Sequence, residues 1–178
     1  ELANYRLSIA PMMDCTDRHF RVLMRQITKK SLLYTEMIVA QAIHYSKNRK
    51  KLLDFDEIEH PISIQLGGDN PSLLAEAAKI AEDWGYDEIN LNIGCPSPKV
   101  KSGNFGACLM GKPKIVADCI DAMKQACDIP ITVKHRLGID NLDSDDHLLQ
   151  FVDSCSNAGA ERLIVHARKA WLNGLNPK

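Results

Sequence analysis

Six short stretches rich in β-branched and other apolar residues recur along the chain, and each is typical of a buried strand. Consecutive stretches start 26 to 43 residues apart, which leaves room for a helix in each connection. This alternation of strands and helices predicts parallel strands joined by right-handed crossovers. The six stretches begin near Arg6, Leu32, Ile62, Glu88, Ile131 and Arg162.

Helical periodicity fills the connections between these strands. Two segments carry apolar residues at positions i, i+3, i+4 and i+7, the pattern of an amphipathic helix. A further helix is expected to begin at Pro113, with Pro130 beyond its end, and another near Asp143 or Ser144. The apolar positions are Phe20, Leu23, Met24 and Ile27 in the first segment, and Leu74, Ala77, Ala78 and Ala81 in the second.

Polar residues stand at the ends of five of the predicted strands. A βα-barrel collects its chemistry at the C-terminal ends of successive strands, whereas an open doubly wound sheet concentrates ligands at one switch point. We therefore expect an α/β fold of the TIM-type (β/α)8 barrel kind, incomplete, with about six parallel strands and intervening helices. The polar strand ends are Glu36, Gln65, Asn92, Lys134 and His166.

The length of the chain limits how much of such a barrel it can form. A closed eight-stranded barrel typically takes about 250 residues, and this chain has 178. We expect residues 1–178 to be one incomplete domain, the N-terminal part of a barrel without its seventh and eighth strands.

Composition changes this picture little, because 45% hydrophobic and 25% charged residues are ordinary for a globular protein. A net charge of −1 argues against a uniformly basic nucleic-acid-binding protein. The six cysteines form no CxxC pair and no cluster with histidine, so we expect neither a metal site nor a disulfide framework.

No apolar stretch approaches the roughly 20 residues that cross a bilayer, and no secretion signal is evident. We expect a cytoplasmic protein without a membrane partner.

The most informative segment follows the fourth strand, where the sequence reads NIGCPSP over 92–98. Gly94 and two prolines predict a stiff loop that holds the Cys95 thiol over the barrel mouth. An ordinary cysteine thiol has a pKa of about 8.5, so at neutral pH it keeps its proton and can act as a general acid. From spacing alone an inert loop cysteine is an equally good interpretation. A nucleophile is a third, although no histidine lies within the motif to activate it.

Other strand ends offer groups for a planar ligand. Gln65, Lys134 and His166 could converge on one such ligand, although each taken singly is more often solvated or structural. The run Pro-Met-Met over 11–13 could place soft side chains against an aromatic ring. A turn with core methionines is the alternative interpretation of that run.

Taken together, these motifs resemble those of the tRNA dihydrouridine synthases, closest to the bacterial DusA group. The resemblance runs along essentially the whole chain, and the joint occurrence of the Cys95 and Lys134 motifs is its most specific part. It is carried by APMMDCTDRHFR, TEM, QLGG, NIGCPSPKV, SGNFGACLM, VKHRLGID and VHARKAWLNGLNPK.

The resemblance implies an FMN- and NADPH-dependent oxidoreductase acting on tRNA. NADPH reduces an FMN that lies across the barrel mouth, hydride passes to C6 of a uracil in the D-loop, near positions 20 and 20a, and Cys95 protonates C5. In this family a C-terminal helical tRNA-binding domain follows the barrel, and we expect the complete protein to be a monomer. The residues carried over are Pro11, Met12 and Met13 along the flavin ring, Gln65, Lys134 and His166 as hydrogen-bond partners of the flavin, and Asn92, Arg136 and Lys178 toward the uracil and the RNA.

Two other functions stay open at this point. One is an FMN-barrel dehydrogenase that acts on a free pyrimidine. The other is a catalytically inactive RNA-binding remnant, against which the retained Cys95 argues. We also expect the isolated chain to bind FMN poorly, to have no measurable activity, and to aggregate through unpaired edges on its first and sixth strands.

Overall fold

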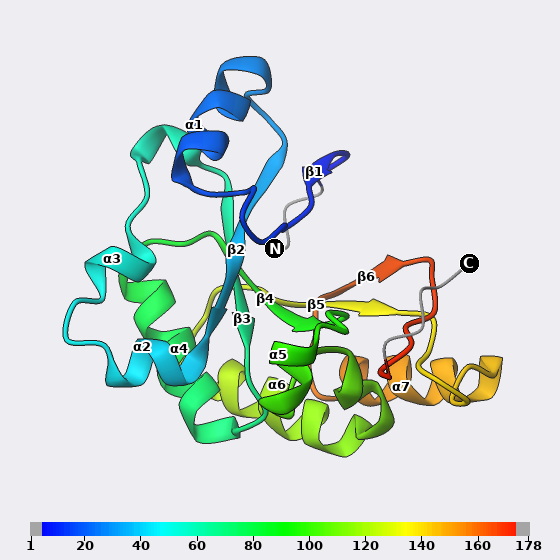
Figure 1. Cartoon of the computed structure of the whole chain (residues 1–178). Coiled ribbons are helices and arrows are strands. Elements are labelled where there is room, and N and C mark those ends of the chain that lie inside the picture. The colour runs from blue at the N-terminus through cyan, green and yellow to red at the C-terminus, as the bar shows by residue number, and fades with distance from the viewer. Residues whose placement is uncertain (1–4, 174–178) are drawn as a thin grey trace.

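The computed structural model describes residues 5–173 and contains one six-stranded parallel sheet that curls into a half-barrel (Figure 1). The strands lie in the sheet in the order in which they occur in the chain, and every neighbouring pair is parallel. They are β1 (Ser8–Ile9), β2 (Leu32–Val39), β3 (Ile62–Gly67), β4 (Glu88–Ile93), β5 (Ile131–Arg136) and β6 (Arg162–His166). The predicted fold class, an incomplete TIM-type barrel of six strands, is confirmed.

Helices cover the convex face of the sheet. In Figure 1, α4, α6 and α7 form a row against β3 to β6, and successive helices of this row contact one another. The edges β1 and β6 stay apart, so the sheet remains open between them. The helices are α1 (Arg18–Ile27), α2 (Ala40–Tyr45), α3 (Lys50–Leu53), α4 (Pro71–Asp83), α5 (Pro98–Ser102), α6 (Pro113–Ala126) and α7 (Asp145–Asn157), with 3-10 turns η1 (Glu57–Glu59) and η2 (Gly106–Gly111).

Local sequence accounts for where the long helices begin and end. The Asn70 side chain accepts a hydrogen bond from the Leu73 N–H at the start of α4, and Gly85 takes the left-handed conformation just after its end, with φ of 88°. Ser144, rather than Asp143, caps α7 by accepting from the N–H of His147. These signals fix the connections that return the chain to the sheet.

The two faces of the sheet differ in polarity. On β3, Ile62, Ile64 and Leu66 are fully buried in the hydrophobic core under the helices. Ser63 and Gln65 alternate with them, and their side chains form hydrogen bonds with residues of β4 on the concave side. The half-barrel therefore has an apolar exterior beneath its helices and a polar interior.

Helix α1 is present where the sequence predicts it, but its apolar stripe does not face the core. Leu23 and Ile27 are 60% and 73% exposed, whereas Arg21 and Arg25 are buried. Arg21 forms an ion pair with buried Glu59. Here α1 lies against β2 and η1 near the open side of the sheet, so nothing in residues 5–173 covers its apolar face.

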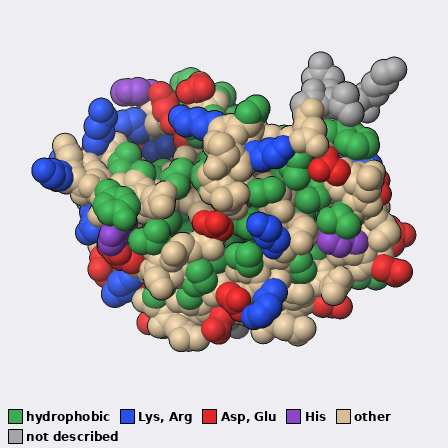
Figure 2. All heavy atoms as spheres, turned by 60° about the horizontal axis from the view of Figure 1, so that its bottom comes forward, with side chains coloured by type: hydrophobic (Ala, Val, Ile, Leu, Met, Phe, Trp, Pro, Cys, Tyr) green, Lys and Arg blue, Asp and Glu red, His purple; other side chains and the backbone are tan. Residues whose placement is uncertain are grey.

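Neither a membrane segment nor a metal centre is found in the described part of the chain. Its helices are all too short or too polar to span a bilayer. Residues 5–173 also contain no group of three or more His, Cys, Asp and Glu side chains placed to hold a metal ion. On the face shown in Figure 2, basic and acidic side chains are interspersed, in keeping with the small net charge.

Candidate active site

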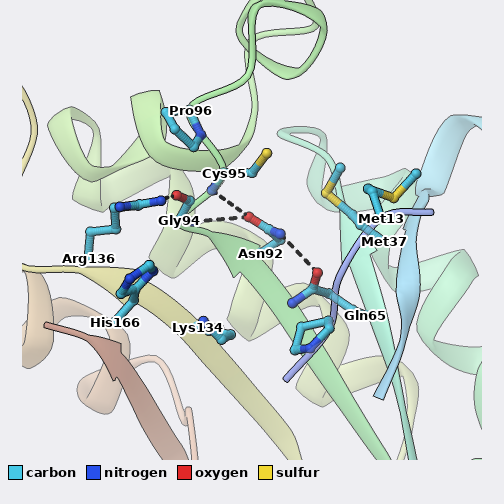
Figure 3. A pocket seen from close by; sticks show the side chains of 11 residues that line it. Met13, Met37, Gln65, Asn92, Gly94, Cys95, Pro96, Lys134, Arg136 and His166 are labelled. Atoms are coloured by element: carbon cyan, nitrogen blue, oxygen red, sulfur yellow. Dashed lines mark hydrogen bonds between the residues drawn. The ribbon is translucent and has the colours of Figure 1, made fainter. Parts of the chain in front are cut away.

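A pocket with a cavity volume of about 240 Å³ lies at the C-terminal ends of the strands, on the concave side of the sheet (Figure 3). The pocket brings together most of the residues singled out from the sequence. Each of the six strands contributes a residue, either from its C-terminal end or from the loop that follows it. The lining residues are Pro11, Met13, Met37, Gln65, Asn92, Gly94, Cys95, Pro96, Lys134, Arg136 and His166.

The backbone of Cys95 is held from both sides. The Asn92 carboxamide oxygen accepts hydrogen bonds from the N–H groups of Gly94, at 3.1 Å, and of Cys95, at 2.9 Å. On the other side, the Cys95 carbonyl oxygen accepts from the Ala107 N–H at 2.9 Å. A Cβ at Gly106, where φ is 73°, would lie 2.6 Å from that same oxygen, so only glycine allows this approach. The stiff loop predicted around Cys95 is therefore present.

The Cys95 side chain is half-buried and lines the pocket together with Lys134 and His166. In Figure 3 its sulfur projects toward the part of the pocket that Met13 and Met37 line. A thiol in this position can meet a ligand bound between the methionines and the cationic side chains. Whether Cys95 is reactive or an inert loop cysteine stays a prediction at this point.

Positive charge gathers on the opposite side of the pocket, where Lys134, Arg136 and His166 lie (Figure 3). Burial lowers the pKa of the Lys134 ammonium, and the nearby charge of Arg136 lowers it further. Partial burial also lowers the pKa of His166, and the charges of Arg136, Lys134 and Arg168 lower it further. Among the described residues, neither the Lys134 ammonium nor the His166 ring has a hydrogen-bond partner. Both groups are thus available to a ligand.

Gln65 reaches the pocket but already has protein partners for both ends of its carboxamide. Its Nε2 donates to Asn90 Oδ1 at 2.8 Å, and its Oε1 accepts from Asn92 Nδ2 at 2.9 Å. The side chain is only 2% exposed. Any ligand contact by Gln65 must use the one N–H or the one lone pair that these bonds leave over.

The structure adds Met37 to the predicted residues and leaves Met12 out of the pocket. The pairing of β2 with β3 shifts between Tyr34 and Met37, so Met37, rather than the preceding glutamate, faces the interior. Glu36 instead accepts a hydrogen bond from the Asp14 N–H at 2.5 Å. Met12 is 43% exposed and does not line the pocket. Lys178 lies outside the described residues.

The pocket suits a flat aromatic group that has a polar rim. Pro11, Met13 and Met37 form an apolar wall of the kind that packs against aromatic rings. Lys134 and His166 face it with hydrogen-bonding groups that lack protein partners. An isoalloxazine ring combines these two properties, so the residues present fit FMN.

A parallel sheet with strands in sequence order, and a ligand pocket at their C-terminal ends, defines the βα-barrel class of enzymes. The chain belongs to the dihydrouridine synthase (Dus) family, whose family model matches residues 8–174. The family named from the sequence motifs is confirmed.

Curated relatives from several bacteria have the same name, tRNA-dihydrouridine(20/20a) synthase. The protein from Synechocystis sp. is 62% identical over 172 residues, which cover 97% of this chain and 51% of the relative. The protein from Xanthomonas axonopodis pv. citri is 56% identical over 178 residues, with 99% and 52% covered. The protein from Escherichia coli O6:H1 is 54% identical over 175 residues, with 98% and 52% covered. The chain spans about half the length of the curated relatives it matches.

Proposed function

We propose that this chain forms part of the catalytic barrel of a flavin-dependent tRNA dihydrouridine synthase, which reduces the C5=C6 bond of a uridine in the D-loop. The observation that carries the proposal is the Cys95 thiol, held by a stiff loop in a pocket that has an apolar wall on one side and cationic groups on the other. The names of the relatives support tRNA as the substrate and positions 20 and 20a as the site of modification.

In the proposed reaction, one hydride and one proton add across the double bond of the uracil ring. When bound, FMN that NADPH has reduced supplies the hydride to C6. The Cys95 S–H bond breaks as its proton passes to C5, where the new C–H bond forms. The resulting thiolate regains a proton from water before the next turnover, so the residue ends each cycle unchanged.

The other pocket residues position the reactants. Lys134 would donate to the polar rim of a bound flavin, the His166 ring would donate to that rim or accept from it, and Met13 and Met37 would pack against the flavin ring. Asn92 keeps one N–H beyond its bond to Gln65, and this N–H contacts a carbonyl oxygen of the uracil.

The target base must leave the stacked RNA to reach this recessed pocket. Unstacking the base costs a few kcal/mol, and less where the base lies in an RNA loop. Cations around the mouth of the pocket would then meet the phosphates. Two of the basic side chains here are already engaged: Lys101 donates to the carbonyl oxygen of Leu172, and Lys169 pairs with Asp143. Lys99, which is exposed on α5, and Arg136, which lines the pocket and keeps four N–H donors beyond the Nε–H that binds Gly94, are the stronger candidates for contact with the RNA.

We further propose that the rest of the barrel packs against the open side of this half-barrel. In the part of the chain that the structure describes, the outer edges of β1 and β6 pair with no strand and one apolar face of α1 is exposed, and further strands and a helix would cover these surfaces. The relatives are about twice as long as this chain, which leaves room for them. On this proposal the isolated chain binds FMN weakly and is inactive.

The proposal is tested with unmodified tRNA, NADPH and the protein at its natural length. Cys95→Ala is expected to lower the rate of dihydrouridine formation by about 100-fold or more, the usual contribution of a positioned acid. Cys15→Ala is the matched control, because Cys15 is exposed and lies outside the pocket. Dihydrouridine formed at the normal rate by Cys95→Ala would exclude the acid role. Reduction of free uracil but not of tRNA would instead identify a free-pyrimidine dehydrogenase, and no reduction of either would identify a remnant that only binds RNA.

A further inference from the structure

A chain of buried side-chain hydrogen bonds runs through the interior of the half-barrel, from the bottom of β4 to the loop that carries Cys95. At its lower end, Thr132 Oγ1 donates to Glu88 Oε1 at 2.8 Å. Asn90 Nδ2 donates to Thr132 Oγ1 at 3.0 Å, and Gln65 Nε2 donates to Asn90 Oδ1 at 2.8 Å. Asn92 links the top of this chain to the backbone of Cys95 (Figure 3). The linked side chains come from three neighbouring strands, β3, β4 and β5.

Every link in the chain points the same way, and both ends require that direction. At the top, the N–H groups of Gly94 and Cys95 can only donate, so Asn92 must turn its oxygen toward them and its amide nitrogen toward Gln65. At the bottom, the Glu88 carboxylate that pairs with Arg162 can only accept, so Thr132 must donate to it. Turning over any one carboxamide would place two donors or two acceptors face to face.

The lower end of the chain is fixed by an ion pair and by two further hydroxyl groups. Arg162 of β6 forms an ion pair with Glu88. The hydroxyl groups of Tyr34 and Ser63 each donate to Glu88 Oε1 at 3.2 Å. Thr132 has a weaker second acceptor, the Ile89 carbonyl oxygen, at 3.2 Å.

The lower four side chains of this hydrogen-bond chain lie inside the protein, away from solvent, whereas Asn92 at its top is partly exposed and lines the pocket. The side chains of Glu88, Asn90, Thr132 and Gln65 are at most 2% exposed. Water therefore cannot replace a missing partner without entering the barrel, and a broken link leaves a buried polar group unpaired.

We propose that Thr132 and Asn90 are positioning residues for the reaction, because this one-directional chain sets the orientation of the Gln65 and Asn92 carboxamides and thereby the position of the Cys95 loop. The effect on catalysis rests on the proposed function. The effect on the position of the Cys95 loop does not depend on that function. Neither residue lines the pocket, so each acts on the site only through Gln65 and Asn92.

The test compares the hydroxyl groups of Thr132 and Ser63. Both donate to Glu88 Oε1, but only the Thr132 hydroxyl is a link in the hydrogen-bond chain that leads to Cys95. Thr132→Val removes the link to Asn90 while keeping the shape of the side chain, and Thr132→Ser keeps the hydroxyl. Ser63→Ala removes another hydroxyl donor to Glu88, one that takes no part in the hydrogen-bond chain. The readout is hydrogen exchange at the N–H groups of Gly94 and Cys95, measured on the protein at its natural length without tRNA.

Thr132→Val is expected to speed exchange at these two amides about 10-fold, whereas Thr132→Ser and Ser63→Ala stay within about 2-fold of the unchanged protein. With tRNA and NADPH, Thr132→Val should lower kcat while leaving KM for tRNA within about 2-fold. Should Thr132→Val not fold, Asn90→Ser interrupts the next link and carries the same expectation.

Two results would overturn the positioning role, whatever the measured activity. One is unchanged hydrogen exchange at Gly94 and Cys95 in the Thr132 or Asn90 variant. The other is exchange that Ser63→Ala speeds as much as Thr132→Val does. Failure of the proposed function would look different, because Cys95→Ala would then retain its activity while the exchange response to Thr132→Val persisted.

Discussion

The guanidinium group of Arg136 donates from Nε to the carbonyl oxygen of Gly94 at 2.7 Å. This contact ties the end of β5 to the residue directly before Cys95. It gives Arg136 a role in holding the loop, in addition to the RNA contact that the motif resemblance implies. Burial, together with the charge of Arg168, lowers the pKa of Arg136, but a guanidinium remains charged at any physiological pH.

Kinetics can separate the two roles of Arg136. If it mainly holds the loop, Arg136→Met should lower kcat about 10-fold with little change in KM for tRNA, because one charge-assisted hydrogen bond contributes roughly 1.5–3 kcal/mol. Arg136→Lys keeps the charge but loses the planar donor geometry, and should recover only part of the rate. A rise in KM alone, together with a weaker salt dependence of tRNA binding, would assign Arg136 to phosphate contact.

His135 is expected to make the stability of the fold depend on pH. The residue is fully buried beside Phe151, its Nε2 has no hydrogen-bond partner within residues 5–173, and burial lowers its pKa below the usual 6.5. Because the unfolded chain then binds a proton more readily than the folded chain, stability falls as the pH drops below about 6.5, by at most about 1.4 kcal/mol per pH unit. Above that pH the contribution is fully present.

Urea denaturation at pH 7.5 and at pH 5.5 measures this effect. His135→Leu should lose less stability between the two pH values than the unchanged protein, and His19→Gln, at an exposed position, should match the unchanged protein. Equal losses in all three would show that His135 does not carry the pH dependence.

Arg25 is expected to contribute more to stability than any exposed ion pair of α1. Its guanidinium donates to four backbone carbonyl oxygens, which join the end of α1 to the segments before β2 and β3. Arg25→Met leaves these oxygens without their donor and should lower the free energy of unfolding by about 3 kcal/mol. The four acceptors are the carbonyl oxygens of Thr28, Ser31, Glu59 and Pro61.

A surface pair on the same helix serves as the control for Arg25. Arg18 pairs with Asp54 at 3.0 Å while its side chain is 49% exposed, so Arg18→Ala should cost less than about 1 kcal/mol. Chemical denaturation of both variants measures the difference. Similar losses would show that the buried network does not anchor α1.

The exposed face of α1 offers a test of the proposed barrel completion. In the 178-residue chain, Ile27→Ser should change stability by less than about 0.5 kcal/mol, because Ile27 is 73% exposed. Leu74→Ala, on the core-facing side of α4, should cost about 2–5 kcal/mol and serves as a positive control. In the protein at its natural length, Ile27→Ser should become destabilising by about 1 kcal/mol or more. An equally small effect there would mean that no further segment covers this face.

The sequence by itself determined the strands, the long helices and most of the pocket. Short runs of β-branched and apolar residues, period-3.6 patterns, and caps such as Asn70 and Ser144 are local signals that depend on neighbouring residues. Residues at the C-terminal ends of parallel strands share one edge of the sheet, so Gln65, Lys134 and His166 could be placed together before any coordinates were known.

Only the tertiary structure decided which side chains face one another. The shift in pairing between β2 and β3 brings Met37 rather than Glu36 into the pocket, and no local pattern encodes a shift between two strands. The apolar stripe of α1 predicts a helix but not what covers it, because burial depends on the neighbouring elements. The hydrogen bonds that join Thr132 to Cys95 through Asn90 cross three strands, and such a network exists only once the strand register is set.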